Sequence, residues 1–214
     1  MKNTLTHSHA GGHTGITLRA FRLNSVANHI MFTGRRGRVY DEIVLLSGVR
    51  PGDSVLDVGS SSGYLTHRLA AAALPSGRVV GVDPSQPAIA HARRRARPGL
   101  EFKVGVVQDL DLPSSSFDLV TCTLAMHHIP ADQRQIAFTE MFRVTRPGGR
   151  LFVADLMSVL RLRGQRAQQP AAKKAAKADP LEDLAATAGY QIQSAGKLPL
   201  LGYIVAVRPQ RARG

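Results

Sequence analysis

The chain has 214 residues, of which 43% are hydrophobic, enough to bury one sizeable core but not two. Its single cysteine, Cys122, excludes an internal disulfide framework and a cysteine-rich metal site. The formal net charge of +13 concerns association with anionic partners such as nucleic acid or acidic surfaces, and it says nothing about the fold.

The amino-terminal segment, residues 1–15, is polar, rich in Gly and His, and predicted to be a disordered tail. Its histidines lack a fixed ligand geometry, so no metal site is predicted there. The chain shows neither the apolar core of a signal peptide nor an apolar run of about 18 residues. We therefore expect a cytoplasmic protein without a transmembrane segment. Residues 16–47 have a helical pattern that ends at Gly48 and are predicted to form a helical lid.

Five short runs rich in Val and Leu then follow, each of strand length. They are "SVLDVG" (54–59), "RVVGVD" (78–83), "EFKVGVV" (101–107), "FDLVTCT" (117–123) and "GRLFVAD" (149–155). Helical patterns separate several of them, and one has Ser85 as a candidate N-cap and Pro87 in its first turn. Strands that alternate with helices predict a mainly parallel sheet with helices on both faces.

The pattern changes at residues 158–180, which are basic, rich in Ala, Gln and Pro, and predicted to be a partly disordered insertion or flap. A helix is expected at 181–190, followed by strands near 190–195 and 203–209. The connection between these strands is too short for a parallel crossover, so the last strand should run antiparallel. The sequence thus predicts an α/β, Rossmann-like core over residues 48–214, with a seven-stranded, mostly parallel sheet.

The turn "GSSSG" after the first strand lies where such folds bind their ligand. A dinucleotide fingerprint would require glycine at positions 59, 61 and 64, but the chain has Ser61 and Tyr64. The Gly-Lys-Ser/Thr ending of a phosphate-binding loop is also missing, because Tyr64 follows Gly63. The turn therefore lacks both common phosphate-binding motifs.

Acidic residues are found where these motifs would lie. Asp57 lies within the first strand region, Asp83 ends the second, and Asp109 follows the third. An acid at the tip of the second strand is well placed to accept both hydroxyls of a ribose. Acids in place of phosphate-binding features favour an adenosine cofactor that has positive charge and no phosphate, namely S-adenosylmethionine.

Five segments resemble a family in order and spacing: "VLDVGSSSGYLT", "VVGVDPS", "VVQDLDLPSSSFDLV", "LAMHHIP" and "VTRPGGRLFVAD". The chain resembles the class I S-adenosylmethionine-dependent methyltransferases of the small "type 11" group, which includes quinone-biosynthesis enzymes, from about residue 40 to 208. The resemblance implies the following roles. Gly59 and Gly63 let the backbone approach the methionine part, Asp57 lies near its ammonium group, Asp83 binds the ribose, Asp109 meets the adenine amine and Leu110 packs on the ring. The candidate cofactor site also includes Tyr40, Ser61, Pro84 and Thr123.

Ser61 departs from the family, which usually has glycine at this position. If the backbone needs a positive φ there, serine costs about 1 kcal/mol or more. Either cofactor binding is weakened, or the serine hydroxyl contacts the cofactor. A relative that has lost the cofactor is the remaining alternative.

Methyl transfer from a sulfonium is an in-line displacement that needs alignment, exclusion of water and sometimes a base. His127 or His128, in the loop after the fourth strand, is a candidate general base, although both could instead cap or pack this loop. Cys122 lies within an apolar run and is expected in the core rather than at a catalytic site.

The acceptor is expected to be a small molecule, methylated on oxygen, nitrogen or carbon. The fourth strand is not followed by the Asn/Asp-Pro-Pro-aromatic motif of base amino-methyltransferases. The alternatives are an RNA-directed or other macromolecular methyltransferase, which the positive charge would suit, and a basic cofactor-binding module without activity. The sequence leaves the acceptor and the oligomeric state open.

Overall fold

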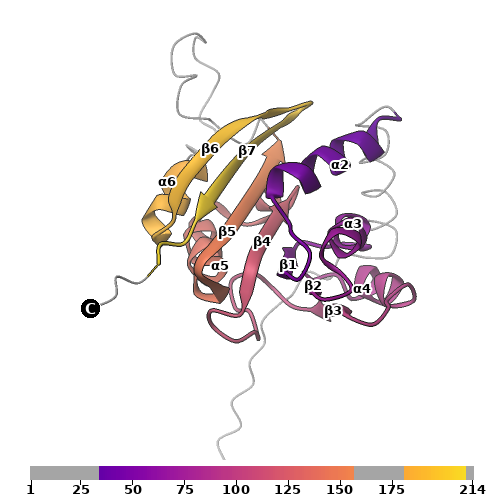
Figure 1. Cartoon of the computed structure of the whole chain (residues 1–214). Coiled ribbons are helices and arrows are strands. Elements are labelled where there is room, and N and C mark those ends of the chain that lie inside the picture. Colours follow the sequence, from indigo (N-terminus) through magenta and orange to yellow (C-terminus); the bar gives the residue numbers. More distant parts are fainter. Residues whose placement is uncertain (1–33, 157–180, 211–214) are drawn as a thin grey trace, which may run out of the picture.

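A computed structural model describes residues 34–156 and 181–210 of the chain (Figure 1). The predicted tail at 1–15, the first part of the predicted lid and the predicted insertion at 158–180 lie outside the described residues.

The described residues form a seven-stranded sheet in the order β3-β2-β1-β4-β5-β7-β6. Its strands are β1 (Ser54–Val58), β2 (Arg78–Asp83), β3 (Leu100–Val104), β4 (Phe117–Thr123), β5 (Thr145–Leu156), β6 (Gln191–Leu198) and β7 (Leu201–Val207). Strands β1 to β5 pair in parallel, and β7 runs antiparallel to both β5 and β6. The predicted fold class, including the antiparallel last strand, is confirmed.

Five α-helices and two short 3₁₀ turns connect these strands within the described residues. They are α2 (Arg36–Ser47), α3 (Tyr64–Ala73), α4 (Gln86–Arg93), η1 (Met126–His128), η2 (Ala131–Gln133), α5 (Arg134–Val144) and α6 (Leu181–Ala188). Two predicted helix boundaries are confirmed, the end of α2 and the start of α4. Gly48 follows α2 with a φ of 67°, and the Ser85 hydroxyl caps α4 by accepting from the Ala88 amide.

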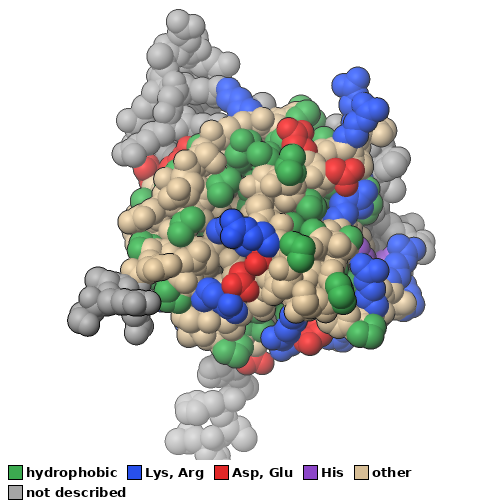
Figure 2. Space-filling model, in the orientation of Figure 1, with side chains coloured by type: hydrophobic (Ala, Val, Ile, Leu, Met, Phe, Trp, Pro, Cys, Tyr) green, Lys and Arg blue, Asp and Glu red, His purple; other side chains and the backbone are tan. Residues whose placement is uncertain are grey.

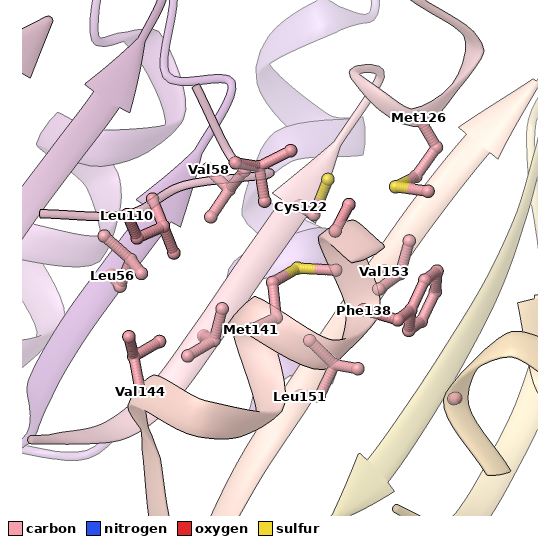
Figure 3. Close-up of a cluster of buried hydrophobic side chains, with 14 of the residues drawn as sticks. Leu56, Val58, Leu110, Cys122, Met126, Phe138, Met141, Val144, Leu151 and Val153 are labelled. Atoms are coloured by element: carbon pink, nitrogen blue, oxygen red, sulfur yellow. The ribbon is translucent and has the colours of Figure 1, made fainter. Parts of the chain in front are cut away.

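The helices cover both faces of the sheet because successive strand residues point to opposite sides (Figure 1). On one face, Leu56, Val120 and Val153 pack with residues of α5 and α6. Figure 3 shows Phe138 and Met141 of α5 against this face, close to Leu151, Val153 and Cys122. On the other face, Val55, Leu119 and Phe152 pack with residues of α2, α3 and α4. Cys122 is fully buried in the first cluster, as expected.

The third strand is shorter than predicted. It ends at Val104, whereas the apolar run in the sequence continues to Val107. The chain leaves the sheet at Gly105, whose amide donates to the Asp83 carbonyl, and then makes a tight turn between Val106 and Asp109. The apolar residues of this turn therefore line a pocket and fill the core instead of extending the sheet.

Candidate functional site

A pocket opens at the carboxyl ends of β1, β2 and β4, beside the start of α3. Its walls come from five parts of the chain: Arg36, Tyr40; Asp57, Val58, Gly59, Ser60, Ser61, Ser62, Tyr64, Leu65; Val82, Asp83, Pro84, Ser85; Gly105, Val106, Val107, Gln108; and Thr123, Leu124, Ala125, His128, Ile129. This is the edge where a parallel sheet of this order binds ligands, because the connections of β1 and β4 leave in opposite directions. The pocket joins eight of the predicted residues: Tyr40, Asp57, Gly59, Ser61, Asp83, Pro84, Thr123 and His128.

Asp57 is the buried anion of the pocket. Its two carboxylate oxygens accept hydrogen bonds from the hydroxyls of Thr66 (2.6 Å) and Thr121 (2.9 Å). Burial raises the pKa of Asp57 to about 6, and the two hydroxyl hydrogen bonds only partly offset this effect. No Lys or Arg among the described residues pairs with it, so the site suits a cationic ligand group.

The turn after β1 needs unusual backbone angles. Gly59 has a φ of 73° and Ser61 a φ of 50°. The amides of Gly59 and Ser60 both donate to the Val82 carbonyl at the end of β2, at 2.8 and 3.0 Å. The turn is thereby fixed against the neighbouring strand, and Ser61 occupies the left-handed conformation that glycine adopts more easily.

Phe102 of β3 explains why positions 63 and 81 are glycine. A Cβ at Gly63 would lie 2.8 Å from Phe102 Cζ, and a Cβ at Gly81 would lie 2.8 Å from Phe102 Cδ1. Gly63 is not itself part of the pocket wall, unlike its neighbours Ser62 and Tyr64. The buried Phe102 ring thus packs directly against both the turn and the second strand.

Asp83 ends β2 and faces the pocket. Its carboxylate accepts from the amides of Ser61 (2.9 Å) and Ser85 (2.8 Å), one on each oxygen. Burial raises the pKa of Asp83, while the two amides act in the opposite direction. Each oxygen keeps a lone pair that a ligand hydroxyl can use.

Asp109 and Leu110 lie outside this pocket, contrary to the roles that the family resemblance implied for them. Asp109 is exposed, and Leu110 is buried in the core cluster below β4. Both line a separate hollow with Glu140 and Arg143. The reason is the early end of β3, which turns Val106, Val107 and Gln108 toward the pocket instead.

Two buried hydroxyls of the pocket, Ser60 Oγ and Thr123 Oγ1, have no hydrogen-bond partner among the described residues. Their residues are 6% and 8% exposed. Because buried polar atoms are nearly always paired in native proteins, each hydroxyl suits a polar group of a ligand. Thr123 was predicted from the sequence, whereas Ser60 was not.

His127 and His128 follow β4 in η1 and take different positions. His128 lines the pocket, and its pKa is lowered, mainly by burial and then by the neighbouring His127. His127 instead bonds Asp155, which is fully buried at the end of β5. The Asp155 carboxylate accepts from the His127 amide at 3.0 Å and lies 2.6 Å from its Nδ1. The two imidazole rings are 4.0 Å apart, centroid to centroid.

Helix α2 contributes Arg36 and Tyr40 to the pocket. The Tyr40 and Tyr64 rings meet edge to face at 4.9 Å, and the Arg36 guanidinium carbon lies 3.9 Å from the centre of the Tyr64 ring. Tyr40 was expected here, but Arg36 and Tyr64 were not named in advance. The signal for Arg36 was its place one helical turn before Tyr40.

These features together fit S-adenosylmethionine. The pocket offers a buried carboxylate without a cation, a second carboxylate at the tip of β2, and two unpaired hydroxyls. A sulfonium and an ammonium group would offset the negative charge, and the ribose hydroxyls would find an acceptor in Asp83.

Residues 55–149 match the protein family described as "Methyltransferase domain". The match identifies a methyltransferase domain over these residues, which are less than half of the chain. The chain is 40% identical over 121 residues to an uncharacterized 37.1 kDa protein in transposon TN4556 of Streptomyces fradiae, and the aligned region covers 55% of this chain and 34% of that protein. It is 35% identical over 133 residues to a demethylmenaquinone methyltransferase of Symbiobacterium thermophilum, and the aligned region covers 60% of this chain and 52% of that protein. The chain thus spans between a third and about half of the length of these relatives.

Solved structures share the fold of this chain. A putative methyltransferase in complex with the Haloferax volcanii Trm112 methyltransferase activator superposes with a TM-score of 0.69 at 18% identity, covering 92% of this chain and 100% of that one. A SAM-dependent methyltransferase from Aquifex aeolicus gives a TM-score of 0.67 at 15% identity, covering 86% and 97%. Within the described part of the chain, no helix has the length and apolar character needed to cross a membrane.

Proposed function

We propose that the protein transfers a methyl group from S-adenosylmethionine to a small-molecule acceptor. The observation that carries the proposal is the pocket itself, which combines the two carboxylates of Asp57 and Asp83 with an apolar and imidazole wall at the end of β4. The demethylmenaquinone methyltransferase among the relatives supports a small acceptor.

S-adenosylmethionine supplies an electrophilic methyl group on a sulfonium. The residues of this chain have the tasks of binding, aligning and excluding water. Asp57 holds the cationic part, Asp83 holds the ribose, and Ser60 and Thr123 offer hydroxyls to the remaining polar groups. Tyr40 and Arg36 of α2 close one side, in line with a lid over residues 16–47.

His128 is the proposed general base. Its ring lines the pocket beside Leu124, Ala125 and Ile129, and its lowered pKa keeps the imidazole neutral and able to accept a proton at neutral pH. An acceptor with an apolar body and one hydroxyl, amine or acidic carbon fits such a wall. The proton that leaves the acceptor would pass to this imidazole.

His127 is proposed to act through its bond with Asp155 rather than by touching the acceptor. Two contacts from the Asp155 carboxylate fix the His127 backbone and ring, and the Leu124 amide at the start of the same loop donates to the Ala154 carbonyl at 2.8 Å. The loop that holds His128 is therefore fixed at both its start and its centre.

A macromolecular acceptor such as RNA is the second candidate, and the net charge of +13 favours it. A third possibility is a cofactor-binding module without transfer activity. In the second candidate the methyl group is transferred to RNA or another macromolecule, and in the third nothing becomes methylated.

The test incubates the full chain with S-adenosylmethionine labelled in its methyl group and a panel of phenols, quinols, amines and mixed RNA. We expect label in at least one small acceptor and none in RNA. Asp83→Ala should abolish transfer and binding of S-adenosylhomocysteine. The two ribose hydroxyls of the ligand would lose their carboxylate acceptor, at about 1.5–3 kcal/mol for each hydrogen bond. His128→Ala should lower kcat and leave that binding unchanged. Labelled RNA would replace the proposal with the second candidate, and binding without any transfer would replace it with the third.

A further inference from the structure

We propose that Arg36 binds the carboxylate of the cofactor's methionyl group, so that the pocket recognises a zwitterion with Asp57 at one charge and Arg36 at the other. This inference rests on the cofactor named in the proposed function and assigns a contact that the sequence comparison did not provide.

Arg36 is the first residue of α2 and belongs to the pocket wall. Its guanidinium carbon lies 3.9 Å from the centre of the Tyr64 ring and 5.5 Å from that of Tyr40. These two rings fix the plane and position of the guanidinium, and its edge remains able to donate hydrogen bonds. A guanidinium that is fixed in this way is prepared for the two parallel hydrogen bonds that a carboxylate accepts.

Arg36 forms no ion pair within the described residues. Its side chain hydrogen-bonds the Tyr40 side chain, while its Nε is buried there without a hydrogen-bond partner. Arg68 provides the contrast, because its guanidinium also lies over the Tyr64 ring, at 4.1 Å, but bonds Asp41 at 3.0 Å. Of the two cations on this ring, Arg36 is the one that has no carboxylate partner among the described residues.

Arg36 and Asp57 act on the same neighbour. Burial raises the pKa of Tyr40, Arg36 lowers it and Asp57 raises it, so the phenol lies within electrostatic reach of both charges. A single end of the pocket therefore carries a buried anion and a fixed cation. An α-amino-acid group has the matching pair of charges, because its ammonium and its carboxylate are attached to the same carbon.

The glycine-serine turn leaves room for this arrangement. Ser62 and Tyr64, on either side of Gly63, line the pocket where α3 begins. The first amides of α3 have no partner within the helix, and their partial positive charge favours an anion at the same place. The carboxylate would then lie between the start of α3 and the Arg36 guanidinium.

The test compares ligands that differ in one group. Calorimetry would measure the affinities of S-adenosylmethionine and decarboxylated S-adenosylmethionine for the full chain, for Arg36→Met and for the control Arg68→Met. We expect the full chain and Arg68→Met to prefer the carboxylated ligand by about 10- to 100-fold, as charge-assisted hydrogen bonds require. Arg36→Met should reduce this preference to about threefold or less, with Arg36→Lys in between.

A third ligand checks that the variant pocket is intact. 5′-Methylthioadenosine lacks the amino-acid group, so its affinity should be equal in the full chain and in Arg36→Met. A full preference for the carboxylated ligand in Arg36→Met would overturn the proposal for Arg36 while leaving the cofactor in place. A full chain that binds none of these ligands would overturn this inference together with the proposed function.

Discussion

Asp57 is a carboxylate that is buried with two threonine hydroxyls and no cation, and this makes its affinity for a cationic ligand depend on pH. Ionised Asp57 is the form that attracts an ammonium group, so bound ligand lowers its pKa below the ligand-free value of about 6. S-adenosylhomocysteine affinity should therefore be constant above pH 6 and fall by up to about tenfold per unit of pH below it.

Calorimetry between pH 5 and pH 8 would measure this dependence. Asp57→Asn keeps the size of the side chain but cannot ionise, so its affinity should be low and nearly independent of pH over the same range. A wild-type affinity that stayed constant down to pH 5 would show that Asp57 does not carry the charge that the ligand recognises.

Ser61 has a backbone conformation that serine tolerates at a cost. Its φ of 50° lies in the left-handed region, and its hydroxyl makes no hydrogen bond among those of the described residues. Ser61→Gly should relieve the strain and raise the free energy of unfolding by about 0.5–1 kcal/mol, net of the extra entropy of glycine in the unfolded chain.

Ser62→Gly is the matched control, because Ser62 has no positive φ and gains nothing from the substitution. It should lower the free energy of unfolding by a similar amount. Denaturant titration of both variants would compare them, and equal destabilisation of the two would contradict the strain at Ser61.

At the scale of elements, α2 combines packing with binding. Val39, Tyr40 and Ile43 are buried in the cluster that α2 shares with α3 and α4, while Arg36 and Tyr40 line the pocket. Deleting residues 1–35 leaves this helix whole and should leave stability and S-adenosylhomocysteine affinity near those of the full chain.

Deleting residues 1–47 should have a larger effect. Removing Ile43 alone is comparable with a large-to-small core substitution, which costs about 2–5 kcal/mol, and the pocket would lose one wall. Thermal unfolding and calorimetry would compare the two deletions. If residues 16–35 complete the lid, the deletion of residues 1–35 should lose turnover while it still binds ligand. Deleting residues 1–14 should change neither turnover nor ligand binding. Full turnover in the protein that lacks residues 1–35 would limit the lid to α2.

At the scale of the whole molecule, most of the net charge of +13 belongs to segments outside the described residues, since the described residues have 17 Lys or Arg and 14 Asp or Glu, a net charge of +3. On the face that Figure 2 shows, Lys and Arg side chains (blue) lie among Asp and Glu (red). Only 5% of the residues are aromatic, so few rings are available to stack on bases. Binding of mixed RNA should therefore be weak and disappear near physiological salt. A filter-binding series in increasing salt would measure it, and affinity that persisted there would favour the macromolecular acceptor.

The fold followed closely from the sequence because alternating strands and helices leave few topologies for a parallel sheet. Each of the seven strands overlaps a segment that was predicted as a strand, five of them apolar runs. The predicted end of the third strand was wrong by three residues, since Val106 and Val107 are apolar for a different reason: both line the pocket, and Val107 is also buried in the core. An apolar run alone does not distinguish a strand from such a turn.

The site was predictable where residues follow strands and unpredictable where the fold joins distant segments. Asp57 and Asp83 were found because both come at the ends of neighbouring parallel strands. Asp155 was missed because it meets His127 across 28 residues. Arg36 was not named, although a residue within about one turn before Tyr40 was expected to face the cofactor, and both residues line the pocket. Asp109, to which the resemblance gave the adenine amine, does not line this pocket and instead lines a separate hollow with Glu140 and Arg143, so its role stays a prediction.

The ring of Phe102 has a consequence for how the sequence can change over time. This ring lies where side chains at positions 63 and 81 would be, and a Cβ at Gly81 would also lie 2.9 Å from the Ser60 Cβ. Alanine at 81 should therefore be accompanied among homologues by a residue smaller than phenylalanine at 102 and by a change at position 60, whereas Gly63 is also held by its φ of 83°. A strand residue outside the pocket would in this way limit the evolution of the turn that holds the cofactor.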